Sequence, residues 1–222
     1  MSFDQLDQAV DHLRRSGVVA LPTDTQYALS AVATDDQAVS AVFRLKQRPG
    51  GEHLPVFLPP ARWREHLAEM ADPLEDRVMA LAEAAWPGAV TLIVNKRPDW
   101  RTRAVDGGTI ALRIPDHPVA TAVLDGLDAP LTGTSANIHG EPASLTADDV
   151  RGQFDSNRGN ERFSESLHIL AENGVMPAGT ASTILDCTGR IPRVLRRGPQ
   201  LSASVGELLM RHWGLSDLES VS

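Results

Sequence analysis

Short apolar runs alternate with amphipathic stretches along almost the whole chain. Runs such as 18–22 (VVALP) and 89–94 (AVTLIV) are rich in β-branched residues, which favour buried strands. Between them lie stretches such as 35–48, whose apolar residues recur at helical spacing. No intervening segment is long and polar enough to mark a domain boundary. The pattern therefore predicts one α/β domain over residues 1–222, with a three-layer arrangement in which helices flank a twisted mixed β-sheet.

Each element can be placed approximately from hydrophobic periodicity and turn residues. Helices are expected at residues 3–13, 35–48, 60–70, 73–85, 117–127, 146–154 and 202–213. Strands are expected at residues 18–22, 25–33, 54–58, 89–94, 109–114, 167–172, 181–186 and 191–197, and a strand running into a loop at 129–137. The last two strands are separated by CTGR, which is typical of a hairpin.

The charge distribution favours a small anionic ligand over a nucleic acid. The chain has a formal net charge of -8, whereas nucleic-acid-binding domains usually carry a basic surface. Positive residues nevertheless gather at two places in an otherwise acidic sequence. These residues are Arg44, Lys46 and Arg48, and then Arg193, Arg196 and Arg197.

Cysteine content and hydropathy indicate a cytoplasmic protein. The single cysteine, Cys187, excludes an internal disulfide and a multi-cysteine zinc site. The first fifteen residues are amphipathic and acidic, without the apolar core of a signal peptide. No stretch approaches the roughly 18 apolar residues that cross a bilayer, so no membrane association is expected.

Several reaction classes lack their sequence motifs. Neither lysine follows a glycine, so no Walker A loop exists, and no G-x-G-x-x-G is present. The segment GTSAN (133–137) differs from the G-x-S-x-G of a nucleophile elbow. The seven histidines form no H-x-H or H-x-x-x-H pair. A covalent or zinc mechanism is therefore not expected, and no metal ligands are predicted among the protein side chains.

Polar residues instead gather at or just beyond the ends of the expected strands, where open α/β sheets form ligand clefts. They provide hydroxyls, an amide and fixed positive charges, which suit phosphate and carboxylate groups. No obvious nucleophile is among them, so catalysis would depend on positioning and electrostatics. The stretches are PTDT (22–25), KQR (46–48), LRIP (112–115), TSAN (134–137) and STILD with LRRG (182–198).

Most of these stretches also have a purely structural interpretation. Thr and Asp after a strand commonly form turns or caps, and Ser135 and Asn137 could simply stabilise a loop. Lys46 and Arg48 lie in the last turn of an expected helix, where positive charges favour the helix dipole. Arg196 could belong to an exposed strand edge. Three histidines are expected at the surface or in loops: His53, His117 and His139.

Arg113 differs from the other candidates. It lies within the apolar run TIALRIP (109–115), and a charge in such a run must be paired or must face a cleft. We therefore expect Arg113 to have a functional role.

These stretches, in this order, resemble the YrdC-like family of L-threonylcarbamoyladenylate synthases in its short, single-domain form. The family pattern runs approximately P-T-[DE]-T-x-Y-G-L, K-x-R-P, W-P-G-P-x-T, R-x-P, S-A-N-x-S-G, S-T-V-V-D and L-R-x-G. The chain has PTDTQYAL, KQRP, WPGAVT, RIPDHP, TSANIHG, ASTILD and LRRG, over about residues 10–198. The resemblance implies a twisted mixed sheet flanked by helices, with a positively charged concave cleft.

The resemblance also implies a reaction. Such an enzyme, a nucleotidyltransferase, makes threonylcarbamoyl-AMP and pyrophosphate from L-threonine, bicarbonate and ATP, with Mg²⁺ accompanying the nucleotide. The carboxylate of N-carboxy-threonine attacks the α-phosphate of ATP. Downstream transferase proteins then move the threonylcarbamoyl group to adenosine 37 of tRNA, which the synthase would contact weakly or indirectly. This chemistry needs a preformed cationic cleft more than it needs a nucleophile.

Carried over position by position, the resemblance assigns residues to the two main substrates. Thr25 would contact threonine, and Arg113 would pair with the threonine carboxylate. Lys46 and Arg48 would hold the ATP phosphates, and with Arg113 they are the predicted catalytic residues. The ATP side would further include Thr109, Ser135, Asn137, Ser182 and Arg196.

The chain departs from the family pattern at several positions. Ala28, Ala89 and His139 replace a glycine, a proline and a serine of the motifs, and residues 52–57 depart from the pattern where threonine contacts would be expected. Two alternatives stay open. One is an RNA-binding module without synthase activity, and the other is a relative of the carbamoyl-transfer proteins of hydrogenase maturation.

Overall fold

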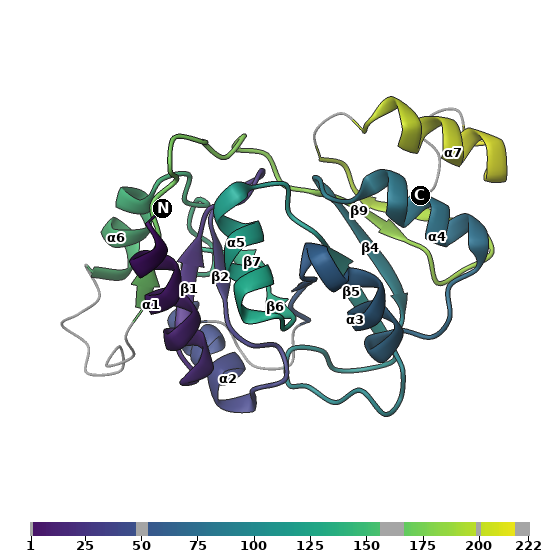
Figure 1. The fold of residues 1–222 in the computed structure, drawn as a ribbon. Helices are drawn as coiled ribbons and strands as arrows, with labels where there is room; N and C mark the ends of the chain where they lie inside the picture. Colours follow the sequence, from purple (N-terminus) through teal and green to yellow (C-terminus); the bar gives the residue numbers. More distant parts are fainter. Residues whose placement is uncertain (1, 48–52, 156–166, 199–200, 216–222) are drawn as a thin grey trace.

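The computed structural model describes residues 2–47, 53–155, 167–198 and 201–215 of the 222-residue chain. Helices and strands alternate along it as the sequence predicts (Figure 1). The helices are α1 Phe3–Arg14, α2 Asp36–Leu45, η1 Pro60–Arg62, α3 Trp63–Met70, α4 Asp76–Ala85, α5 Pro118–Leu127, α6 Ala147–Asp155 and α7 Ala203–Trp213. The strands are β1 Val18–Leu21, β2 Ala28–Ser30, β3 Val56–Phe57, β4 Val90–Asn95, β5 Thr109–Arg113, β6 Leu131–Thr132, β7 Thr134–Ser135, β8 Leu167–Ile169, β9 Thr183–Asp186 and β10 Arg193–Arg196.

The strands form two mixed sheets rather than the single sheet expected from the sequence. The first sheet has the order β7-β2-β1-β8, and the second has the order β10-β9-β4-β5-β3-β6. Both contain parallel and antiparallel pairs, and β9 and β10 form the expected antiparallel hairpin. An isolated bridge between Val32 and Leu131 links the two sheets. The predicted α/β class and the mixed pairing are therefore confirmed. The expectation of a single sheet is wrong, because the strands form two sheets.

The division arises at Gly133, within the segment 129–137 that was expected to be a strand running into a loop. Its first part, β6, pairs with β3 of the second sheet, whereas its second part, β7, pairs with β2 of the first. Phe57 packs so closely that a Cβ at Gly133 would lie 2.3 Å from its ring. Only glycine fits this approach without a shift. The break carries Ser135 into the region between the sheets.

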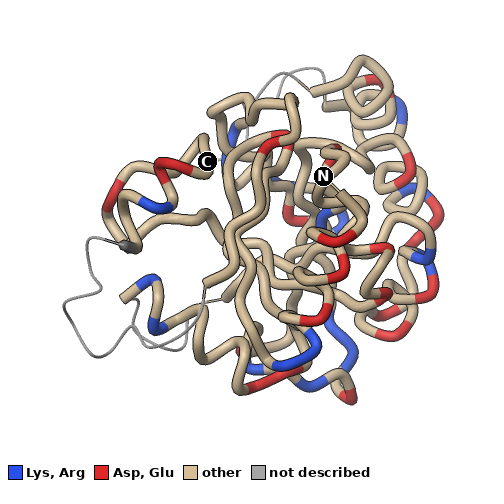
Figure 2. Tube along the Cα trace, turned by 60° about the vertical axis from the view of Figure 1, so that its left-hand side comes forward, with Lys and Arg blue, Asp and Glu red and all other residues tan. Residues whose placement is uncertain are grey.

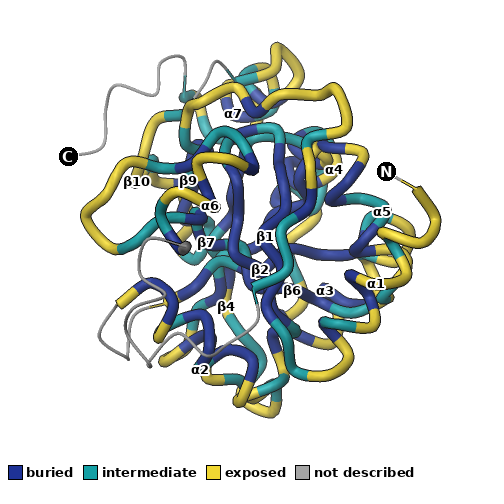
Figure 3. The backbone as a smooth tube through the Cα atoms, turned by 90° about the vertical axis from the view of Figure 1, so that its left-hand side faces the viewer, coloured by how far each residue is buried: buried dark blue, intermediate teal, exposed yellow. Residues whose placement is uncertain are grey.

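The first sheet is covered by helices on both faces. Side chains alternate along a strand, so Val19 and Leu21 of β1 point to one face and Val18 and Ala20 to the other. One face packs in the same buried cluster as α1 and α5, and the other packs with α2 and α6. Figure 3 shows the resulting buried strands inside a more exposed outer layer. This is the three-layer arrangement that the sequence predicts.

The second sheet has one face that is packed against helices. Leu92, Leu112 and Leu185 are cross-strand neighbours that pack in one buried cluster with residues of α3, α4 and α7. Their sequence neighbours Thr91 and Arg113 line an opening on the opposite face. The period-two alternation of the strands therefore separates a hydrophobic face from a polar one.

Helix α2 shows how local signals set the ends of an element. The Asp35 carboxylate caps its start by accepting hydrogen bonds from the backbone of Gln37 at 2.9 Å and of Ala38 at 3.1 Å. The helix ends at Leu45, earlier than expected, and Lys46 is its C-cap residue.

Along the described chain, Asp and Glu are spread over the helices rather than gathered in one patch (Figure 2). None of the helices in the described ranges has the length and apolar character needed to span a membrane.

Candidate active site

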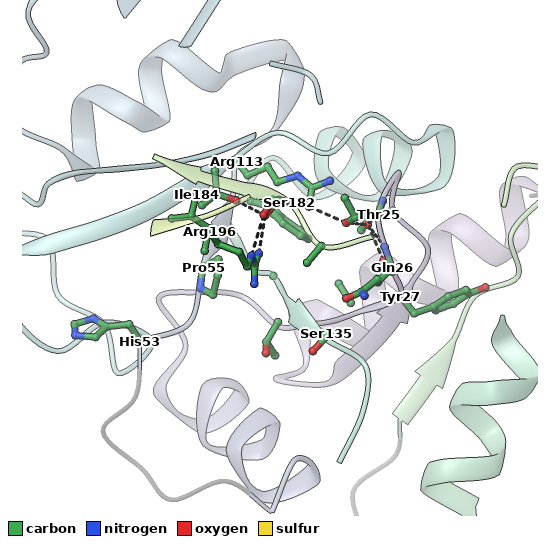
Figure 4. A pocket seen from close by; sticks show the side chains of 17 residues that line it. Thr25, Gln26, Tyr27, His53, Pro55, Arg113, Ser135, Ser182, Ile184 and Arg196 are labelled. Atoms are coloured by element: carbon green, nitrogen blue, oxygen red, sulfur yellow. Dashed lines mark hydrogen bonds between the residues drawn. The ribbon is translucent and has the colours of Figure 1, made fainter. Parts of the chain in front are cut away.

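A cleft of about 360 Å³ opens on the face of the second sheet that carries Thr91 and Arg113. Its lining comes from both sheets, namely the loop after β1, strands β2 and β7, and the polar face of β3, β4, β5, β9 and β10. Figure 4 shows the side chains that surround it. Sequence-predicted residues that line the cleft are Thr25, Arg113, Ser135, Ser182 and Arg196.

Arg113 is a buried positive charge in the wall of the cleft, with 5% of its surface exposed. Its Nε donates to the Gly88 carbonyl at 2.9 Å, and one terminal nitrogen donates to Thr25 Oγ1 at 2.9 Å. The other terminal nitrogen donates to the Asp24 carboxylate. A guanidinium has five N–H donors, so one N–H on each terminal nitrogen has no partner among the described residues. Such a pair of donors matches the two oxygens of a carboxylate.

Burial and ion pairing have opposite effects on the pKa of Arg113. Removal from water lowers the pKa of the guanidinium, whereas the charge and hydrogen bond of Asp24 raise it. The nearby positive charge of Arg196 lowers the pKa further. Asp24 is itself held in place by the backbone N–H of Asp116, at 3.2 Å. Arginine keeps its proton in proteins, so the cleft wall carries a fixed positive charge that Asp24 partly balances.

A second polar group lies on the β9 side of the cleft. Arg196 donates to the Ser182 carbonyl at 2.9 Å and to the Ser182 hydroxyl at 3.0 Å. The same hydroxyl lies 2.9 Å from Thr91 Oγ1. Partial burial lowers the pKa of the Arg196 guanidinium. Gly198 allows this close packing, because a Cβ there would lie 2.3 Å from the Ala181 carbonyl oxygen.

Lys46 connects the end of α2 with the segment after β7. Its ammonium donates to the carbonyls of Ser135 at 2.5 Å and Asn137 at 2.9 Å, and to Asn137 Oδ1 at 3.2 Å. The Ser135 hydroxyl donates to Asn137 Oδ1 at 2.5 Å. The Asn137 amide nitrogen donates to the carbonyls of Ile138 and Glu141 at 3.0 and 2.6 Å. In this structure Lys46, Ser135 and Asn137 hold one loop together, and their contacts with ATP stay a prediction.

The remaining predicted residues lie in different places. Thr109 begins β5, at the opposite end of the strand from Arg113, and is not among the residues that line the cleft. Asn137 lies just beyond the lining residue Ser135. Arg48 lies outside the described residues. The contacts of Thr109 and Arg48 with the nucleotide therefore stay predictions.

His117 is not the surface or loop residue that the sequence suggested. It is 1% exposed and caps the start of α5, where its Nδ1 accepts from the Val119 backbone at 3.2 Å. Its Nε2 lies 3.0 Å from the Val175 carbonyl. The sequence did not suggest this burial, because Val175 lies 58 residues from His117 along the chain. His53 and His139 are exposed as expected, and His53 also lines the cleft.

Three site residues were not identified individually from the sequence. Asp24 and Thr23 lie inside the stretch PTDT, which was considered only as a whole. Thr91 lies in the apolar run AVTLIV, where its hydroxyl is the one polar side-chain group and could have marked the face of the strand that lines a cleft. Because Leu92 pairs with Leu112, the residue before Leu92 shares a sheet face with Arg113.

Comparison with known sequences identifies the family. Residues 11–198 match the Sua5/YciO/YrdC family, which carries the description "Telomere recombination". The chain belongs to this family. The threonylcarbamoyl-AMP synthase of Bacillus subtilis is 33% identical over 219 residues, which cover 96% of this chain and 60% of that relative. The threonylcarbamoyl-AMP synthase of Pyrococcus abyssi is 30% identical over 206 residues, 90% of this chain and 57% of the relative. The chain thus spans less than two thirds of the length of either relative.

Solved structures of Sua5/YciO/YrdC proteins have the same fold. The crystal structure of P. abyssi Sua5 complexed with L-threonine is 28% identical, with a TM-score of 0.78, covering 92% of this chain and 57% of that chain. Escherichia coli YciO is 23% identical with a TM-score of 0.74, covering 91% and 93%, and at this identity it shows the fold alone. The family and fold expected from the sequence motifs are confirmed.

Proposed function

We propose that this Sua5/YciO/YrdC protein is an L-threonylcarbamoyladenylate synthase, which makes threonylcarbamoyl-AMP and pyrophosphate from L-threonine, bicarbonate and ATP. The observation that carries the proposal is the buried Arg113, whose terminal nitrogens each keep one N–H without a partner among the described residues. These donors would bind the threonine carboxylate through two parallel hydrogen bonds. The names of the relatives and the threonine complex of P. abyssi Sua5 support the same substrate.

The nucleotide would occupy the part of the cleft that faces β9 and β10. Arg196 and Ser182 lie there, and a phosphate would accept hydrogen bonds from both. Lys46 and Arg48 would act on the triphosphate from the end of α2, and Thr109, Ser135 and Asn137 would complete the nucleotide side. Within the described ranges no three His, Cys, Asp or Glu side chains are grouped to hold a metal. The Mg²⁺ that accompanies ATP would be held mainly through phosphate and water oxygens.

Catalysis would rest on positioning and charge. Arg113 would hold threonine by its carboxylate, so that its amino group can take up bicarbonate as a carbamate. The carbamate oxygen would then attack the α-phosphate, and the fixed positive charges of the cleft would stabilise the negative charge that develops. The mixed anhydride so formed is reactive, and it would pass to transferase proteins that modify tRNA in the cytoplasm.

The two alternative functions have less support. An RNA-binding module would need a basic surface, whereas this chain has a net charge of -8. Full-length HypF in a phosphate- and nucleotide-bound form has a TM-score of 0.71, but it is 16% identical and shows the fold alone. Neither the charge of the chain nor the likeness to HypF favours these alternatives over the synthase.

The decisive experiment measures pyrophosphate release from ATP with threonine and bicarbonate added separately and together. We expect release only when both are present. The Arg113→Ala variant should release little pyrophosphate at threonine concentrations that saturate the wild-type protein. Pyrophosphate release that ignores threonine would overturn the proposed function.

A further inference from the structure

Thr23 and Thr25 both belong to the lining of the cleft, and Thr23, at 1% exposed, is the more deeply buried of the two. The Thr23 hydroxyl oxygen is 2.6 Å from the Gln26 carbonyl and 2.9 Å from Thr25 Oγ1. It also accepts from the backbone N–H groups of Thr25 at 3.1 Å and Gln26 at 3.2 Å. These contacts join Thr23 to both the backbone and the side chain of the loop that forms one wall of the cleft.

The hydrogen positions in this group follow from counting donors. A threonine hydroxyl has one hydrogen, and a carbonyl can only accept, so the Thr23 hydrogen points to the Gln26 carbonyl. The contact between the two hydroxyls is then a hydrogen bond only if Thr25 is its donor; it takes one lone pair of Thr23 Oγ1, and the two longer backbone N–H contacts share the other. Thr25 Oγ1 also accepts from Arg113 at 2.9 Å. One lone pair on Thr25 Oγ1 is then left without a partner among the described residues, and Thr25 lines the cleft.

We propose that Thr23 is a positioning residue that fixes the Thr25 hydroxyl as a hydrogen-bond acceptor for the amino nitrogen of an amino-acid substrate. The inference rests on the proposed function, because it needs a carboxylate at Arg113. The amino nitrogen is separated from the carboxylate by a single carbon. It is thus the donor of threonine closest to the carboxylate, and Thr25 is a direct neighbour of the arginine that would hold that carboxylate.

An acceptor suits this nitrogen both before and after it reacts. The amine combines with bicarbonate to give an N-carboxylate and water, forming a C–N bond and losing a hydroxide and one N–H proton as that water. The carbamate nitrogen keeps one hydrogen. A lone pair on Thr25 can therefore hold the substrate amine and the carbamate in the same orientation.

The test compares the binding of L-threonine with that of (R)-3-hydroxybutanoate, which has the same carboxylate and hydroxyl but no amino group. Calorimetry gives the ratio of the two dissociation constants for each protein. The wild-type protein should bind L-threonine at least about tenfold more tightly than the analogue. Thr23→Val, which keeps the side-chain shape without the hydroxyl, should reduce this ratio severalfold. Thr23→Ser should retain it.

The outcomes separate this inference from the proposed function. Thr25→Val removes the acceptor but leaves the Thr23 bonds to the backbone, so it should also reduce the ratio, and it replaces Thr23→Val if that variant does not fold. An unchanged ratio in the folded Thr23→Val or Thr25→Val protein, with normal threonine-dependent pyrophosphate release by the wild type, overturns the inference alone. A wild-type protein that binds no threonine overturns both.

Discussion

The carboxylate of Asp24 and the guanidinium of Arg113 form an ion pair in the wall of the cleft, with side-chain exposures of 17% and 5%. Each also contacts other groups: Asp24 accepts from the Asp116 backbone, and Arg113 donates to Gly88 and Thr25. The arginine is thus held in one orientation before a substrate arrives. Such a preorganised fork can bind a carboxylate without losing further side-chain freedom.

Replacing Arg113 with lysine tests this geometry while the positive charge is kept. A lysine ammonium is a compact charge without the planar fork that binds a carboxylate through two hydrogen bonds. We expect threonine affinity to fall by about tenfold or more, and ATP affinity to change less. Titration of each substrate with the variant gives both values. Arg97→Lys, at an arginine paired with exposed Asp99, is the control. A fall in ATP affinity as large as that in threonine affinity would contradict the assigned role.

Lys46→Met tests whether the loop around Asn137 depends on the buried ammonium. The variant removes donors from the carbonyls of Ser135 and Asn137 and leaves these oxygens without their cation. We expect destabilisation of about 2 kcal/mol or more, measured by denaturant unfolding, together with a loss of pyrophosphate release. Lys96→Met is the matched control, because Lys96 also donates to two backbone carbonyls but lies away from the cleft. It should lose stability and keep activity.

Gly198→Ala tests the close approach behind the Arg196 side of the cleft. The new Cβ would meet the Ala181 carbonyl oxygen at 2.3 Å and the Thr183 nitrogen at 2.4 Å, and backbone atoms cannot move aside cheaply. We expect destabilisation of about 2–4 kcal/mol in thermal or denaturant unfolding. Gly206→Ala, in the interior of α7 with open space around it, should instead be neutral or slightly stabilising. Equal effects at the two glycines would show that the packing is not the cause.

The stability of the β9–β10 hairpin should depend on pH through Asp186. Burial by itself raises the pKa of this carboxyl, but hydrogen bonds from Thr188 and Arg193 outweigh it, and the pKa lies below its ordinary value. The carboxylate therefore contributes stability above the ordinary pKa of about 3.9, and this contribution is lost as the pH falls through the lower pKa of the folded state. Asp186→Asn should lower the melting temperature at pH 7 and flatten its fall below about pH 4. If the melting temperatures of the two proteins fell equally steeply below pH 4, this linkage would be excluded.

Local signals explain why much of the fold could be predicted. Helix α2 is marked by its Asp35 cap and by apolar residues at helical spacing, and strands such as β4 by a β-branched run. The same reasoning placed Arg113 in a cleft, because a charge in an apolar strand needs a partner or an opening. Ser182 and Arg196 were found from motif resemblance and strand ends. All of these signals lie within a few residues of the feature that they predict.

Contacts between distant segments could not be predicted in this way. The segment 129–137 was expected to be a strand running into a loop, and only the Phe57 ring against Gly133 shows why it contributes strands to both sheets. Lys46 has a reasonable role as a charge at a helix end. Its actual partners, Ser135 and Asn137, lie 89 and 91 residues further along the chain.

The sequence by itself determined the α/β class, the family and the stretches that bring polar side chains to the strand ends, because periodicity and motifs are properties of short segments. Only the tertiary structure decided that Asp24 balances Arg113, that the Thr23 and Thr25 hydroxyls are in contact, and that Lys46 holds a loop. The physical reason is that a hydrogen bond or ion pair depends on distance and direction between atoms. The packing of the two sheets sets the distances and directions between these side chains.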